Sequence, residues 1–125
     1  MKMSRAKWLA ALRQLHQERR HRLRRLTRNH ALAIGTVARV HRKCGHPRCH
    51  CRTGLGHPQT LFLFKDPRVG RRRCKLVRRA DEARLQQAGE RYREFRADLQ
   101  RLRALDREEK RILMALAETR AIDYE

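Results

Sequence analysis

Residues 44–57 read Cys-Gly-His-Pro-Arg-Cys-His-Cys-Arg-Thr-Gly-Leu-Gly-His, so three cysteines and a histidine recur in a C-x4-C-x-C-x5-H pattern. Three thiolates and one imidazole complete a tetrahedron around Zn²⁺, with bonds of about 2.3 Å to sulfur and about 2.0 Å to nitrogen. Such a site leaves no position open for water or substrate. Glycine and proline between the ligands suit a backbone that wraps an ion. The stretch therefore predicts one structural zinc ion, with the ligands Cys44, Cys49, Cys51 and His57.

The fourth ligand is less firmly fixed by the sequence than the three cysteines are. His46 and His50 lie in the same stretch, so either of them could replace His57. The remaining cysteine, Cys74, falls on a predicted strand outside the pattern. We interpret it as a small buried hydrophobic residue.

Disulfide and catalytic sites are weaker interpretations of the same stretch. Cys49 and Cys51 are too close together for an easy mutual disulfide. The N-terminal residues lack the apolar segment of a secretory signal, so we expect the thiols to lie in a reducing cytosol. Catalytic zinc needs an open coordination position and a general base, and no acidic residue occurs between residues 20 and 64. We expect no catalytic residue and no enzymatic activity.

The charge of the chain is strongly positive and unevenly distributed. Lys and Arg number 33 against 13 Asp and Glu, which gives a net charge of +20 at pH 7. Residues 1–79 contain 23 of the basic residues and two acids, whereas residues 80–125 contain ten basic residues and 11 acids. Such an excess of positive charge favours a polyanionic partner. We therefore expect nucleic acid to contact the first two thirds of the chain.

Most of the basic residues are arginine, whose planar guanidinium group binds phosphate with two hydrogen bonds. They concentrate in an arginine-rich helix, around the cysteines and on a predicted hairpin. The predicted nucleic-acid contacts are Arg19, Arg20, Arg22, Arg24, Arg25, Arg28, Arg42, Lys43, Arg48, Arg52, Arg71, Arg72 and Arg73.

Periodicity predicts an α+β fold. Leucines and Trp8 recur at helical spacing over residues 4–28, and Ser4 is a suitable N-cap. β-branched residues and turn residues then predict a three-stranded antiparallel sheet, with strands at 35–43, 60–65 and 73–77. Residues 61–64 are hydrophobic without alternation, which predicts that both faces of this strand are covered.

A long helix is predicted from residue 81 to residue 118. Its hydrophobic residues follow a heptad pattern, which is typical of a coiled coil. Thirty-eight residues would extend about 57 Å, further than a small sheet can cover, so this helix needs a second helix as a partner. We expect a single domain over residues 1–125, formed by a basic N-terminal helix (1–30), a zinc-knuckle sheet (31–79) and the long heptad helix (80–125).

The stretch Arg-Lys-Cys-Gly-His-Pro-Arg-Cys-His-Cys of residues 42–51, followed by His57-Pro58, resembles a family of small bacterial proteins of unknown function. Its members carry R-K-C-G-x-P-x-C-x-C and then H-G-P, a β-hairpin and a charged C-terminal helix, and are commonly encoded near transposases. The likeness spans about residues 34–117. This chain differs from the family by having Pro58 directly after His57 and Leu61–Phe64 in place of a tyrosine-rich strand. The resemblance implies the same ligands, Cys44, Cys49, Cys51 and His57, and a mobile-element context.

Together these features predict a zinc-stabilised nucleic-acid-binding accessory protein that assists a transposase or recombinase. DNA is favoured over RNA as its partner, although the sequence does not decide between the two. The long helix would pair with the first helix, with its copy in a homodimer or with a larger protein partner. No segment is apolar enough to span a membrane. We expect a cytoplasmic, nucleoid-associated protein. The alternative is a protein-interaction adapter or an RNA-binding component of a larger ribonucleoprotein particle.

Overall fold

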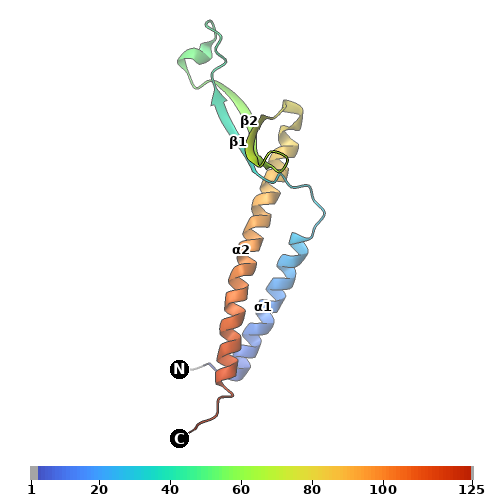
Figure 1. Cartoon of the computed structure of the whole chain (residues 1–125), viewed down its shortest axis with the longest axis vertical. Helices are drawn as coiled ribbons and strands as arrows, with labels where there is room; N and C mark the ends of the chain where they lie inside the picture. Colours follow the sequence, from blue (N-terminus) through green and yellow to red (C-terminus); the bar gives the residue numbers. More distant parts are fainter. Residues whose placement is uncertain (1–2, 125) are drawn as a thin grey trace. The chain divides into compact units, whose positions relative to one another are not determined.

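A computed structural model describes residues 3–124 and confirms the α+β prediction (Figure 1). Residues 1, 2 and 125, which the predicted segments include, lie outside the described residues. No helix within residues 3–124 is both long and apolar enough to cross a membrane. The elements are α1 (Arg5–Leu26), β1 (Thr36–Arg42), β2 (His57–Asp66), β3 (Arg71–Leu76) and α2 (Glu82–Glu118), with short 3-10 turns at His50–Thr53 and Arg79–Asp81.

The chain forms two compact units. One unit combines the chain up to Asn29 with the chain from Glu94 onward, and the other consists of His30–Arg93. The first unit is therefore discontinuous in sequence, and α2 contributes residues to both. The prediction of one domain over residues 1–125 stays a prediction.

The first unit is a helical hairpin of α1 and the C-terminal part of α2 (Figure 1). The N-cap of α1 is Ser4, as predicted, because the Ser4 hydroxyl accepts a hydrogen bond of 3.3 Å from the Lys7 amide. The core of the hairpin contains Leu15 of α1, which packs with three hydrophobic residues of α2. Burial of each such side chain stabilises the hairpin by about 1.5–3 kcal/mol. The buried residues of α2 are Leu105, Ile112 and Leu116, and the partly buried residues around them are Trp8, Leu9, Ala11, Leu12 and Leu102.

The second unit contains an antiparallel sheet in the order β1-β2-β3. Strand β2 begins at His57, three residues earlier than predicted, because His57 pairs with Arg42 at the end of β1. The turn between β2 and β3 is closed by the amides of Val69 and Gly70, which both donate to the Asp66 carbonyl. Each strand is thus fixed by its neighbour.

The N-terminal part of α2 packs against one face of this sheet. The Ala33 amide donates a 3.1 Å hydrogen bond to the Ala88 carbonyl. At Gly89 an added Cβ would lie 3.0 Å from Cγ2 of Val37, so glycine permits the close approach of helix and strand. Val37 is the cross-strand partner of Phe62 and therefore shares its face of the sheet.

The opposite face of the sheet is more open than the sequence predicts. Leu63 of β2 is 39% exposed and Leu76 of β3 is 61% exposed. The prediction that both faces of residues 61–64 are covered is therefore wrong for Leu63. The physical reason is that this unit contains one α-helical segment, the start of α2, which packs on the face of Val37 and Phe62.

Candidate metal centre and basic surfaces

Cys44, Cys49, Cys51 and His57 form a cluster in which all four ligand atoms lie within 4.8 Å of one another. The Sγ atoms of Cys44 and Cys51 are 3.6 Å apart, and Cys49 Sγ is 3.1 Å from His57 Nε2. Ligand atoms around a tetrahedral zinc ion are separated by roughly 3.5–3.8 Å, given the usual bond lengths. The Cys44–Cys51 separation falls in this range and the Cys49–His57 separation is shorter, so the four residues are consistent with one metal site.

The two strands and a short turn place these ligands. Cys44 follows β1 by two residues, Cys51 lies in the 3-10 turn and His57 begins β2. The amide of Cys49 donates to the His46 carbonyl at 3.1 Å, and its carbonyl accepts from the Arg52 amide at 3.2 Å. The ligands are therefore held by backbone hydrogen bonds as well as by the sheet. The connection between β1 and β2, residues 43–56, is hereafter called the knuckle.

Gly56 is the residue of the knuckle that most clearly requires glycine. Its φ is +91°, and an added Cβ would lie 2.7 Å from the Arg42 carbonyl carbon and 2.8 Å from its oxygen. Gly54 differs, since its φ of −129° is open to other residues and an added Cβ would meet only the His50 carbonyl, at 3.9 Å. Gly56 therefore allows the chain to pass closely over the end of β1 just before His57.

The other histidines of the knuckle and the fourth cysteine are not part of the cluster. His46 Nδ1 accepts a 3.2 Å hydrogen bond from the Arg48 amide, and the His50 ring lies 5.8 Å from the His57 ring. Cys74 lies on β3 and is exposed, so the prediction that it is buried is wrong. The reason is that β3 is an edge strand whose residues are all exposed.

The thiols of the cluster have perturbed acidities. A backbone hydrogen bond from His46, followed by contacts with Cys51, His57 and Cys49, lowers the pKa of Cys44 from 9.0 to about 6. For Cys49, the Cys51 amide lowers the pKa, but the thiol of Cys51, burial and Cys44 raise it above its usual value overall. One thiolate is thus available near neutral pH, which is the form that binds metal.

Cationic side chains surround the cluster without a carboxylate partner among residues 3–124. Lys43 Nζ donates to the Arg52 carbonyl at 3.0 Å, and Arg52 Nη1 donates to the Pro47 carbonyl at 3.3 Å. A pocket of about 330 Å³ lies beside Cys51 and is lined by Lys43, Arg52 and neighbouring residues of the knuckle. Arg42 and Arg48 are also exposed. The knuckle therefore presents fixed positive charge.

On the β2–β3 hairpin, Arg73 has a carboxylate partner, whereas the two arginines before it, Arg71 and Arg72, have none among residues 3–124. Arg73 Nη1 lies 2.9 Å from Asp66 Oδ2, while the Arg68 amide donates to Asp66 Oδ1 at 2.9 Å. The hydrogen bond from Arg73 contributes most to lowering the pKa of Asp66 below its usual value, and the hydrogen bond from the Arg68 amide contributes next. Arg71 and Arg72 are exposed and have no carboxylate partner in residues 3–124.

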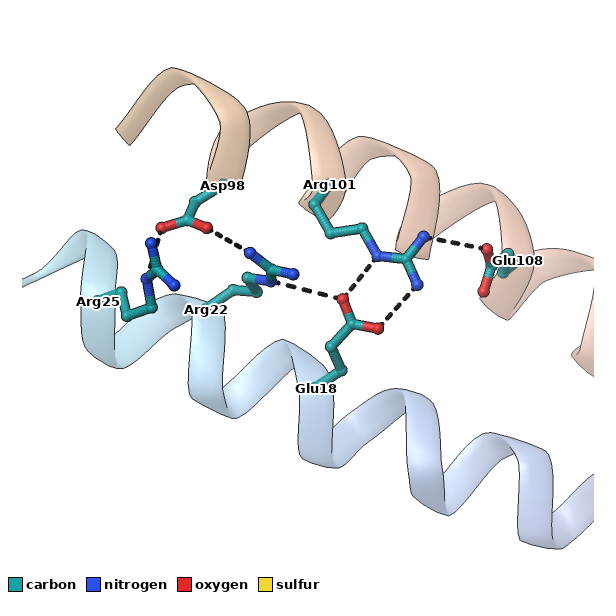
Figure 2. A network of polar contacts seen from close by, with 6 residues as sticks. All are labelled: Glu18, Arg22, Arg25, Asp98, Arg101 and Glu108. Carbon is teal, nitrogen blue, oxygen red and sulfur yellow. Dashed lines mark hydrogen bonds and ion pairs between the residues drawn. The ribbon is translucent and has the colours of Figure 1, made fainter. Parts of the chain in front are cut away.

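Three of the predicted phosphate contacts on α1 instead pair with carboxylates of α2. Arg22 Nη1 lies 2.7 Å from Asp98 Oδ1 and Arg25 Nε lies 3.1 Å from Asp98 Oδ2 (Figure 2). Arg19 lies 2.8 Å from Asp106 and 3.2 Å from Glu109. These three arginines therefore stabilise the helical hairpin.

A further arginine–carboxylate pair joins the two helices, with the arginine on α2 and the carboxylate on α1. Arg101 of α2 donates two hydrogen bonds, of 2.6 and 2.7 Å, to the carboxylate of Glu18 on α1 (Figure 2). The hydrogen bond from Arg101 holds the pKa of Glu18 below its usual value, although burial opposes it, and the same bond raises the pKa of Arg101. Arg101 also lies 3.4 Å from Glu108. The pair joins the two helices with the two-bond geometry that is typical of arginine and carboxylate.

The remaining predicted contacts on α1 and just beyond it are exposed. Arg20, Arg24 and Arg28 have no carboxylate partner within residues 3–124. This division was not predicted, because in the sequence the arginines of residues 19–28 look like one surface. The signal in the sequence that could have revealed this division is the set of acidic residues of α2 that face α1. Those acids are Glu94, Asp98, Asp106 and Glu109.

Comparisons of this chain with known protein families, with curated proteins and with solved structures find no match.

Proposed function

We propose that the protein is a zinc-stabilised DNA-binding protein that acts as an accessory factor of a mobile element. One observation carries the proposal: positive charge remains on the surface after the ion pairs within the protein are formed. The carboxylates of the hairpin pair with Arg19, Arg22 and Arg25, whereas other predicted contacts stay exposed. These are Arg20, Arg24, Arg28, Arg42, Lys43, Arg48, Arg52, Arg71 and Arg72.

Phosphate groups are the partners that such a surface fits best. Each phosphate that is neutralised releases counterions, so binding is favourable and weakens as salt increases. Phosphate contacts position a protein on nucleic acid without reading its sequence. The proposed binding is therefore mainly independent of sequence.

Zinc would contribute to this function by fixing the knuckle. The ion would be held by Cys44, Cys49, Cys51 and His57, and it would link the end of β1 to the start of β2. Because Lys43 and Arg52 already donate to backbone carbonyls of the same loop, a fixed loop also fixes their charges. The proposed role of zinc is structural.

The accessory role rests on the resemblance of residues 42–58 to bacterial proteins commonly encoded near transposases. The partner would be a transposase or a recombinase that acts on the same DNA. Co-purification of a tagged chain with a candidate transposase or recombinase, after nuclease treatment, tests this part separately from DNA binding. Loss of the complex after nuclease treatment would mean that DNA alone joins the two proteins.

An electrophoretic titration at two salt concentrations tests DNA binding directly. The variant Arg20→Gln/Arg24→Gln/Arg28→Gln should bind duplex DNA more weakly than the wild type, and its affinity should depend less steeply on salt, by a slope of about 0.9 per lost contact. Wild-type binding to structured RNA in preference to duplex DNA would favour a ribonucleoprotein component. Absence of binding near physiological salt would favour a protein-interaction adapter.

A charge-matched control separates this surface from the overall charge. Lys65→Gln/Arg79→Gln/Arg120→Gln removes three exposed cations that lie outside the proposed surface. The control should bind DNA more tightly than the first variant does. Equal losses in the two variants would contradict the assignment of the surface.

A further inference from the structure

In the helical hairpin, the side of α2 that faces away from α1 carries a row of cations. The net charge of the C-terminal third does not reveal this row, because acidic residues elsewhere on α2 balance it. Residues 80–125 are nearly neutral as a whole. Nevertheless, four exposed cations of α2 lie along the hairpin, each two residues from a buried position. They are Arg96 beside Asp98, Arg103 and Arg107 on either side of Leu105, and Lys110 beside Ile112.

This spacing determines the direction in which the side chains point. Two residues turn an α-helix by about 200°, because one turn contains about 3.6 residues. Asp98, Leu105 and Ile112 are 2%, 1% and 5% exposed and belong to the side of α2 that meets α1. The four cations therefore point away from α1. We name Arg96, Arg103, Arg107 and Lys110 the α2 face.

Helix α1 has the same arrangement on its own outward side. Arg13 lies two residues before the buried Leu15, and Arg20 and Arg24 lie two residues before and after Arg22, which pairs with Asp98. All three outward arginines are exposed and have no carboxylate partner in residues 3–124. We name Arg13, Arg20 and Arg24 the α1 face.

Carboxylates do not neutralise either face. Over residues 94–110 of α2 each acidic side chain forms an ion pair with an arginine, and four of the five pair with arginines of α1. On α1 the acidic residue is Glu18, which pairs with Arg101. Residues 3–29 and 94–124 still contain 16 Lys or Arg against eight Asp or Glu. The excess positive charge is therefore placed on two opposite sides of the hairpin.

We propose that the helical hairpin binds two separate segments of nucleic-acid duplex, one on the α1 face and one on the α2 face, and thereby bridges them. This inference rests on the proposed function, since it assumes that phosphate is the partner. It adds a second binding surface, in a helix that the charge distribution of the sequence had not assigned to nucleic acid.

The dimensions of a helical hairpin argue against both faces contacting one groove. Two packed helices have axes about 8–10 Å apart, and each helix with its side chains is about 10–12 Å wide. The two faces are thus about 20 Å apart, whereas the major groove is about 12 Å wide. At about 1.5 Å per residue, the α1 face extends about 16 Å and the α2 face about 21 Å, long enough for several phosphates each.

A two-duplex capture experiment tests the inference with the full-length, zinc-loaded protein. One duplex is fixed to beads, a second labelled duplex of different sequence is added, and the label retained on the beads is measured. The two test variants are Arg13→Gln/Arg20→Gln/Arg24→Gln for the α1 face and Arg96→Gln/Arg103→Gln/Arg107→Gln for the α2 face. Each variant is used at a concentration that saturates a single duplex in an electrophoretic titration.

The wild type should retain the labelled duplex, and each single-face variant should retain at least tenfold less while still binding one duplex. The control Lys65→Gln/Arg79→Gln/Arg120→Gln should retain it as the wild type does. Circular dichroism should show unchanged helix content in both face variants, because the substituted side chains are exposed.

The outcomes separate this inference from the proposed function. A wild type that binds no duplex at all would overturn both. A wild type that binds one duplex but retains no second one would overturn the bridging alone. Single-face variants that still capture the second duplex would also overturn it, because two copies of the chain, each using its remaining face, would then explain the capture.

Discussion

The carboxylate of Asp98 accepts a 2.7 Å hydrogen bond from Arg22 of the other helix, although only 4% of the Asp98 side chain is exposed. Arg25 contacts the second carboxylate oxygen at 3.1 Å. A buried carboxylate is costly unless it is paired and hydrogen-bonded. Asp98 is therefore the acid on which the pairing of α1 with α2 depends most.

Asp98→Ala should lower the free energy of unfolding of the hairpin by about 1–3 kcal/mol, because two arginines lose their shared partner but remain partly accessible to water. Urea unfolding followed by circular dichroism at 222 nm measures this change. Glu94→Ala is the matched control, since Glu94 is 67% exposed and 3.8 Å from Arg25. Its cost should stay below about 1 kcal/mol. Equal costs for both variants would show that burial of Asp98 is unimportant.

The Glu18–Arg101 pair predicts a dependence of stability on acid pH. Because the pKa of Glu18 in the folded protein is below its usual value of 4.5, the pair stabilises the fold fully above that value. The stabilisation is lost as the pH falls through the lowered pKa. The difference in melting temperature between the wild type and Glu18→Gln should therefore be larger at pH 7 than at pH 3. A difference that is independent of pH would contradict the ionic role of Glu18.

Gly56→Ala should weaken zinc binding about tenfold or more, because an added Cβ would clash with the Arg42 backbone and φ is positive there. Strain of this kind costs about 1–3 kcal/mol. Competition with a chromophoric chelator measures the affinity. Gly54→Ala is the control and should bind zinc within about twofold of the wild type, since its added Cβ has space. Similar affinities for both variants would argue against the close approach at Gly56.

Protein purified without added metal should contain about one equivalent of zinc per chain by elemental analysis. Cys51→Ser should lose most of this zinc, because Cys51 is a buried member of the cluster. Cys74→Ser should keep it, since Cys74 lies outside the cluster on an exposed strand. Metal-free wild-type protein with a folded sheet would show that the cluster is not a structural metal site.

The order of helices and strands, and the four residues of the cluster, could be predicted from the sequence. Local signals sufficed for them: the spacing of Cys44, Cys49, Cys51 and His57, the turn at residues 66–70 and the periodicity of both helices. The Ser4 cap was also correctly predicted, because a cap depends on residues close in sequence.

The division of the arginines could not be predicted, because it depends on how α1 and α2 are aligned. Arg22 and Arg24 look alike in the sequence, yet one faces Asp98 and the other faces solvent. The alignment is set by the packing of Leu15 with Leu105 and Ile112, which lie 90 and 97 residues further along the chain. The exposure of Cys74 and Leu63 escaped prediction for a similar reason, since it depends on which face of the sheet α2 covers.

The discontinuous hairpin has a consequence for the way the chain matures on the ribosome. Domains generally begin to fold as they emerge, and synthesis proceeds at about 5–20 residues per second. Arg19, Arg22 and Arg25 emerge well before Asp98, Asp106 and Glu109, so for several seconds the nascent first helix carries them without their carboxylates. The knuckle and the sheet are synthesised during that interval, while α1 still lacks its partner helix. The carboxylates of α2, which are translated later, therefore pair with these three arginines and remove them from contact with competing polyanions.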